Sequence, residues 1–194
     1  MRTERKRRDL RREKAAEAGR LFRMAYARQL DGELDQAFVL YEKSIRLHAT
    51  AEAHVHLGWA LATREQVEEA IEHCRQAIQL DPDFANPWND IGAYYIELDR
   101  PEEALFFLKR AVRMRSYALR CYPHYNLHRA YLALGDRERA VTHLHEALDA
   151  DPDFGPALAA LSDLLFPGGP IESLDDEMDD CLRAGTPVLA LPPR

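Results

Sequence analysis

The chain has 194 residues, of which 46% are hydrophobic and 30% are charged, and its formal net charge is −7 at pH 7. This composition is typical of a soluble, helix-rich protein and not of a disordered one, and no run of about 18 apolar residues is available to span a membrane. The three cysteines are widely spaced and form no C-x-x-C pair, which excludes a recognisable disulfide framework or zinc knuckle.

The N-terminus is strongly basic, since residues 1–14 hold eight basic and three acidic side chains. The acids are interspersed with good helix formers, so we predict that residues 1–17 form a solvated helical extension. No apolar segment of the kind found in secretory signals follows it, so we expect a cytoplasmic protein. Arginine outnumbers lysine by 22 to 4, a bias that suggests a bacterial genome rich in G and C.

Small residues recur at a nearly constant spacing through the middle of the chain. Alanines in equivalent places step by 33, 34 and 36 residues, at Ala37, Ala70, Ala104 and Ala140. The tetrapeptide Asp-Pro-Asp-Phe at 81–84 also returns unchanged at 151–154. Each unit holds two stretches with apolar residues at helical spacing, joined by a short turn, which predicts an antiparallel helix pair. Such a period predicts a stacked solenoid, because no unit can bury its apolar face alone.

The predicted helices occupy residues 18–31, 33–48, 51–63, 67–80, 85–98, 101–115, 121–134 and 137–150. Gly32 and Gly135 mark the turn between the two helices of the first and fourth units. Residues 155–166 begin like a further first helix and then stop at a Pro-Gly-Gly-Pro sequence, so we predict a capping helix there. Residues 167–194 are predicted to be an acidic, amphipathic tail, and we hypothesise that it packs back onto the repeats.

The four units resemble the tetratricopeptide repeat, which carries small residues in fixed slots of both helices and large apolar ones in others. The third unit shows the pattern with Trp88, Ile91, Gly92 and Tyr95 in its first helix and Ala104, Leu108 and Ala111 in its second. The resemblance covers residues 18–154 in the units 18–50, 51–84, 85–120 and 121–154, of which the first matches least well. It implies an all-α, right-handed superhelical solenoid of antiparallel helix pairs.

No residue pattern indicates catalysis or metal binding. The chain has no G-x-S-x-G, phosphate-binding Gly-rich loop or H-E-x-x-H sequence. His124 and His128 share one helical face, and His143 and His145 are two residues apart, but a metal site needs three or four converging ligands. Because His54 and His124 fall in the aromatic packing slot of the repeat, we expect a non-enzymatic protein with no metal, cofactor or small-molecule substrate.

The resemblance implies that function lies on the concave surface, which the first helices of the units line. The residues predicted to face this groove are Phe22, Arg23, Tyr26, Val55, His56, Trp59, Asn86, Asn89, Asp90, Ala93, Tyr122, Tyr125, Asn126 and Arg129. Aromatic and arginine side chains often dominate interface energetics, so we expect a peptide or helix of a partner protein to bind there. Some family members grip acidic chaperone tails with a clamp that includes lysine and arginine, but the matching places here hold neither residue, and Asp90 would repel a carboxylate.

The sequence therefore predicts an adaptor for protein–protein interaction. One alternative is a cytosolic chaperone for a secreted or assembling client protein. The other is nucleic-acid binding through the basic N-terminal arm, which would depend on salt concentration, although the acidic remainder of the chain speaks against it.

Overall fold

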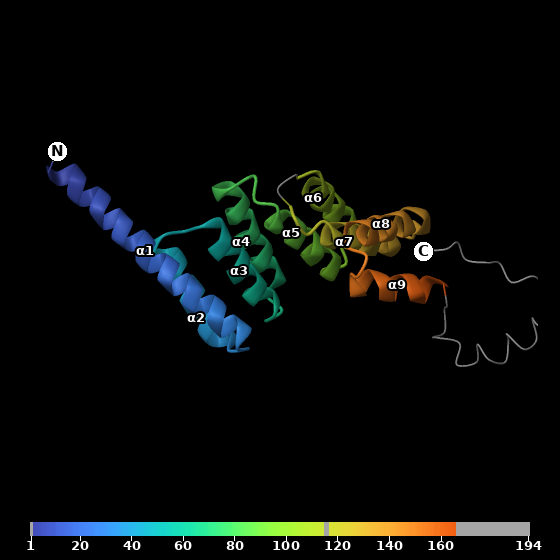
Figure 1. The fold of residues 1–194 in the computed structure, drawn as a ribbon, viewed down its shortest axis with the longest axis horizontal. Helices are drawn as coiled ribbons and strands as arrows, with labels where there is room; N and C mark the ends of the chain where they lie inside the picture. Colours follow the sequence, from blue (N-terminus) through green and yellow to red (C-terminus); the bar gives the residue numbers. More distant parts are fainter. Residues whose placement is uncertain (1, 115–116, 166–194) are drawn as a thin grey trace, which may run out of the picture.

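The computed structural model describes residues 2–114 and 117–165, and within these residues every regular element is an α-helix (Figure 1). The elements are α1 (Arg2–Leu30), α2 (Leu34–Leu47), α3 (Ala51–Ala62), α4 (Val67–Leu80), α5 (Asn86–Glu97), α6 (Pro101–Arg113), α7 (Cys121–Ala133), α8 (Arg137–Ala150) and α9 (Gly155–Leu165). The predicted all-α class is confirmed. The hypothesis on the C-terminal tail falls on residues that lie outside the described ones.

In the part of the chain that the structure describes, the helices form four antiparallel pairs that stack in chain order. Each odd-numbered helix from α1 to α7 packs most closely against the even-numbered helix that follows it, and α9 packs against α8. Figure 1 shows the pairs succeeding one another along the long axis of the molecule, with the first half of α1 projecting beyond α2. This is the predicted right-handed solenoid of helix pairs with a capping helix, and it brings the first helices of neighbouring pairs together, as α5 with α7.

Small residues allow the two helices of each pair to approach closely. The four repeated alanines Ala37, Ala70, Ala104 and Ala140 are all 0% exposed. In the third pair a Cβ atom added to Gly92 would lie only 2.4 Å from Cγ and Cδ2 of Leu108. His128 occupies the equivalent place in the fourth pair, where it is buried and its Nδ1 lies 3.0 Å from the carbonyl oxygen of Ala140. A carbonyl can only accept, so this Nδ1 carries the proton.

The turn between the two helices of a pair requires left-handed backbone at one position. The φ angles are 78° at Gly32, 63° at Glu65, 56° at Asp99 and 75° at Gly135, and these positions follow the spacing of the repeat. Glycine adopts this conformation without steric cost, whereas other residues are strained in it. The turns predicted at the two glycines are therefore confirmed, and Glu65 and Asp99 hold the same geometry without glycine.

Candidate partner-binding surface

The residues predicted for the groove all lie on α1, α3, α5 and α7, the first helices of the four pairs. They differ in how much surface they offer. The exposed members are Arg23, Tyr26, Trp59 and Tyr122; the half-buried members are Phe22, His56, Asn86, Asp90, Ala93, Tyr125 and Arg129; the buried members are Val55, Asn89 and Asn126. The exposed members are the ones positioned to contact a ligand without rearrangement.

Three of the four exposed members are aromatic. The exposed fraction is 43% for Tyr26, 40% for Trp59 and 45% for Tyr122. Tyr26 and Trp59 hold the same place in consecutive units, and Ala93 and Arg129 continue that place in the third and fourth units. We call Tyr26, Trp59, Ala93 and Arg129 the first-helix row, because one residue from each first helix contributes to it.

Several rings pack together where the first two units meet. The imidazole of His56 stacks on Tyr41 with ring centroids 5.5 Å apart and takes edge contacts from Phe22 at 5.3 Å and Tyr26 at 5.4 Å. The side-chain oxygen Oε1 of Gln29 accepts a hydrogen bond from the Tyr41 hydroxyl at 2.6 Å and lies 3.2 Å from His56 Nδ1. Burial lowers the pKa of His56. The cluster therefore joins the two units with a neutral imidazole, and it supports one edge of the exposed Tyr26 ring.

A chain of polar side chains connects the third and fourth units. Arg129 Nη1 donates to Asn126 Oδ1 at 3.1 Å, Asn126 Nδ2 donates to Asn89 Oδ1 at 3.0 Å, and Asn89 Nδ2 donates to Asp90 Oδ1 at 3.2 Å. Burial raises the pKa of Asp90 to about 7, and the hydrogen bond from Asn89 opposes that rise. These side chains satisfy one another, so their main structural effect is to bind α5 to α7.

The two predicted tyrosines of α7 pack against the turn that leads to α9. The Phe154 ring makes edge contacts with Tyr122 at 5.0 Å and with Tyr125 at 5.6 Å. Tyr125 also stacks on His128 at 5.9 Å. Tyr125 thus contributes to the packing of the fourth unit, while nearly half of the Tyr122 surface stays accessible.

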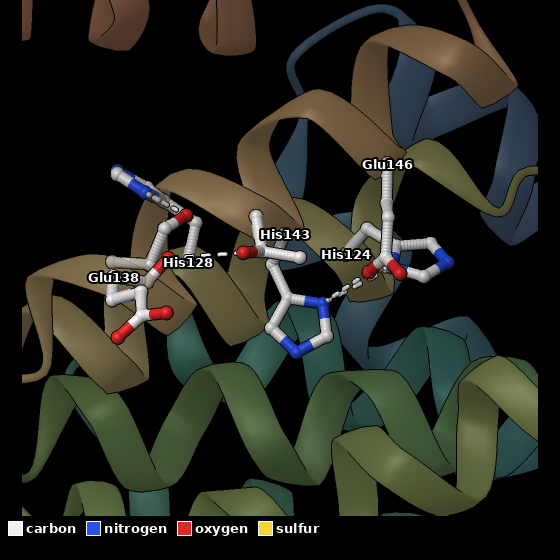
Figure 2. A network of polar contacts seen from close by, with 7 residues as sticks. His124, His128, Glu138, His143 and Glu146 are labelled. Carbon is white, nitrogen blue, oxygen red and sulfur yellow. Dashed lines mark hydrogen bonds and ion pairs between the residues drawn. The ribbon is translucent and has the colours of Figure 1, made fainter.

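One cluster of side chains was missed by the sequence reasoning. His124 on α7 meets His143 and Glu146 on α8, with the two Nδ1 atoms 3.4 Å apart and Glu146 Oε2 at 3.0 Å and 2.5 Å from them (Figure 2). The signal that could have found it is the second pair His54 and His73, which has the same separation of 19 residues and also meets across a helix pair. Pairs of residues in one helix say nothing about a partner on the next helix.

Comparison with known proteins agrees with this architecture. The tetratricopeptide repeat family profile matches residues 51–84, 73–106 and 124–158. The peroxisomal targeting signal receptor of Eremothecium gossypii is 30% identical over 103 residues, which is 53% of this chain. This chain spans only 18% of the length of that receptor.

Solved structures give the same fold. The structure of pilF from Pseudomonas aeruginosa has a TM-score of 0.73 at 23% identity and covers 81% of this chain and 70% of its own. A thermophilic TPR protein of Thermus thermophilus, TTC0263, has a TM-score of 0.67 at 22% identity and covers 86% and 89%. Among the described residues, no helix is both long and apolar enough to cross a membrane. Since the repeat profile matches residues 51–106 and 124–158 and the described residues form four stacked helix pairs followed by a further helix, the chain contains tetratricopeptide repeats, which typically form non-enzymatic scaffolds and mediate protein–protein interactions.

Proposed function

We propose that the protein is a scaffold that binds a peptide or helix of a partner protein across its first helices. The observation that carries the proposal is the exposure of Tyr26, Trp59 and Tyr122, at 43%, 40% and 45%, on α1, α3 and α7. Exposed aromatic rings are favourable interface anchors because they bury a large apolar area at a low entropic cost. Exposed rings on three of the four first helices suit an elongated ligand.

The charged residues near the exposed rings favour a ligand that carries both apolar and acidic groups. Arg23 is exposed and Arg129 is half-buried, so both can meet acidic or carbonyl groups. Asp90, between them in the stack, has a pKa of about 7 and is therefore only partly ionised at neutral pH. We accordingly expect a partner segment with apolar or aromatic side chains at its centre and acidic groups toward its ends.

The test is crosslinking followed by measurement of affinity. A photoreactive phenylalanine analogue in place of Trp59 should crosslink to a partner protein in the native cell. The matched control is Phe106, which is also exposed, at 67%, but lies on the second helix α6. With the partner purified, replacing both Tyr26 and Trp59 by Ala should weaken binding by about 2 kcal/mol or more, whereas Phe106→Ala should not. Equal crosslinking from both positions, or equal affinity of the variants, would refute the proposal.

The two alternatives give different results in the same experiments. A chaperone would crosslink through Trp59 to several unrelated apolar clients instead of one partner. Nucleic-acid binding would depend on the exposed basic residues in the first half of α1 and would fall as salt is raised. Neither the Tyr26 nor the Trp59 substitution would then affect it.

A further inference from the structure

Three metal-ligand side chains converge between α7 and α8 in the fourth unit. The separations are 3.4 Å between the Nδ1 atoms of His124 and His143, 3.0 Å from His124 Nδ1 to Glu146 Oε2, and 2.5 Å from His143 Nδ1 to the same oxygen. Figure 2 shows Glu146 reaching toward both rings. Their side chains are 13%, 20% and 43% exposed in the order His124, His143 and Glu146. The convergence point can therefore be reached from solvent past the carboxylate.

The second unit holds the same pair of histidines but has a glutamine at the place of Glu146. His54, His73 and Gln76 precede His124, His143 and Glu146 by 70 residues each. The Nδ1 atoms of His54 and His73 are 2.9 Å apart, so the paired imidazoles belong to the way the repeat packs. The fourth unit differs in replacing the neutral amide of Gln76 with a carboxylate.

The third unit shows what the same three places do when no histidine is present. They hold Trp88, Phe107 and Arg110, with the two rings 6.0 Å apart and the guanidinium 5.7 Å from the Trp88 ring. That unit places its own cation over the Trp88 ring. The fourth unit instead offers one negative charge and two imidazole nitrogens, a combination that suits an added cation.

The separations fit tetrahedral coordination. With metal-to-ligand distances of about 2.0–2.2 Å, tetrahedral angles put neighbouring ligand atoms roughly 3.3 Å apart. The distances from His124 to the other two ligands are close to this value, and only the pair His143 and Glu146 must separate, by less than about 1 Å. Glu146 is the most exposed of the three, so rotation of its side chain can supply that movement.

We propose that His124, His143 and Glu146 form a binding site for a divalent transition-metal ion such as Zn²⁺. Each neutral imidazole keeps its single proton on Nε2 and uses the Nδ1 lone pair, the carboxylate is the third ligand, and water fills the fourth position. Tyr131 stacks on His143 with a centroid distance of 5.4 Å and an interplanar angle of 8°, which holds that ligand in place. The charge of Arg120 near His124 opposes a cation, so we expect moderate affinity. The bound ion would clamp α7 to α8.

The test is titration of the full chain with Zn²⁺ after treatment with a chelator. Calorimetry should show one ion per wild-type chain, and Zn²⁺ should raise the melting temperature. Glu146→Gln reproduces the side chains of the second unit and should weaken binding about tenfold or more. The matched control His73→Gln alters the other histidine pair and should leave the affinity within about twofold of wild type. A Cys181→Ser background removes one thiol that could bind the ion independently.

A substitution in the second unit should create a second metal site. Gln76→Glu gives the second unit the same three ligands, so the stoichiometry should rise from one ion to two. Tetrahedral Co²⁺ can replace Zn²⁺ and gives a visible absorption band, which should disappear in Glu146→Gln. Absence of saturable binding to the wild type, or binding that is equal in wild type and Glu146→Gln, would overturn the proposal. So would a Gln76→Glu variant that still binds one ion.

Discussion

The close approach of α5 and α6 predicts a cost for adding a single methyl group at Gly92. A Cβ there would lie 2.4 Å from Cγ and Cδ2 of Leu108 and 3.3 Å from its Cδ1. Leu108 is 0% exposed, so its side chain has little room to move. Overpacking of this kind costs about 1–3 kcal/mol, whereas replacing Gly by Ala inside a helix gains roughly 1 kcal/mol. We expect Gly92→Ala to destabilise the protein by about 1 kcal/mol.

Gly19 in α1 provides the matched control. A Cβ at Gly19 would meet only Arg23 Nη1, at an ordinary contact distance of 3.6 Å. Gly19→Ala should therefore gain the helix propensity alone and stabilise the protein by about 0.5–1 kcal/mol. Since both substitutions change propensity equally, the difference between the two variants isolates the steric cost, about 1–3 kcal/mol.

The stability of both variants is measured by urea denaturation followed by circular dichroism. The midpoints of the transitions are compared, because a solenoid can unfold unit by unit. A double-mutant cycle with Leu108→Ala adds a second test. Leu108→Ala alone should cost about 2–5 kcal/mol by opening a cavity, and in its presence Gly92→Ala should cost nothing or stabilise. If Gly92→Ala stabilises the wild type as much as Gly19→Ala does, the helices are farther apart than described and the reasoning is wrong.

Three further predictions concern the turn, the polar chain and the capping helix. Glu65→Gly should stabilise the protein by about 0.5–1 kcal/mol in urea denaturation, because Glu65 has a φ of 63° and glycine relieves that strain; a loss of stability would contradict this. Asp90 has its pKa raised from 3.8 to about 7, so its contribution to stability is intact below pH 4 and declines as pH rises toward 7. The free energy of unfolding of Asp90→Asn should equal that of wild type near pH 4 and exceed it at pH 8, by on the order of 2 kcal/mol after allowance for partial exposure. A difference in stability that does not change with pH would refute the raised pKa of Asp90. Phe154 is only 7% exposed and packs on the α7 tyrosines, so Phe154→Ala should lower the free energy of unfolding by about 3 kcal/mol. Hydrogen exchange should become faster in α9 than in α3, and an equal loss of protection in both helices would argue against a local role.

Much of the fold could be predicted because the same helix pair occurs several times along the chain. The spacing of Ala37, Ala70, Ala104 and Ala140 predicted positions that are 0% exposed. Small residues at a constant interval are required wherever two helices must approach, so their pattern is visible without coordinates. Helix ends were also predictable to within two residues for α2 to α8, because turns and prolines interrupt the periodic pattern.

The first helix shows how local chemistry can be read from sequence. The first repeat helix was predicted from residue 18, preceded by a helical extension, and α1 runs unbroken from Arg2 to Leu30. The pair Glu17 and Arg20 stabilises it across that junction with a distance of 2.6 Å, and the left-handed Gly32 follows its end. Helix propensity and i,i+3 pairs are short-range, so the sequence contains them.

Exposure within the predicted groove was decided by the stacking of the pairs. Val55 and Trp59 lie one helical turn apart on α3, yet Val55 is 7% exposed and Trp59 is 40% exposed. Asn89 and Asn126 were predicted to face a ligand but are buried and hydrogen-bonded to each other. Periodicity identifies one face of one helix, whereas the rotation between successive pairs determines how much of that face the next unit covers.

The sequence by itself determined the repeat, the helix pairs, the turns and the family resemblance, because each depends on residues close together in the chain or on a regular interval. Only the tertiary structure brought His124 to His143 and Glu146, and only it distinguished this unit from the second, where His54 and His73 meet beside Gln76. Contacts between helices depend on their crossing geometry and on side-chain rotamers, and neither is contained in the spacing of residues along one helix.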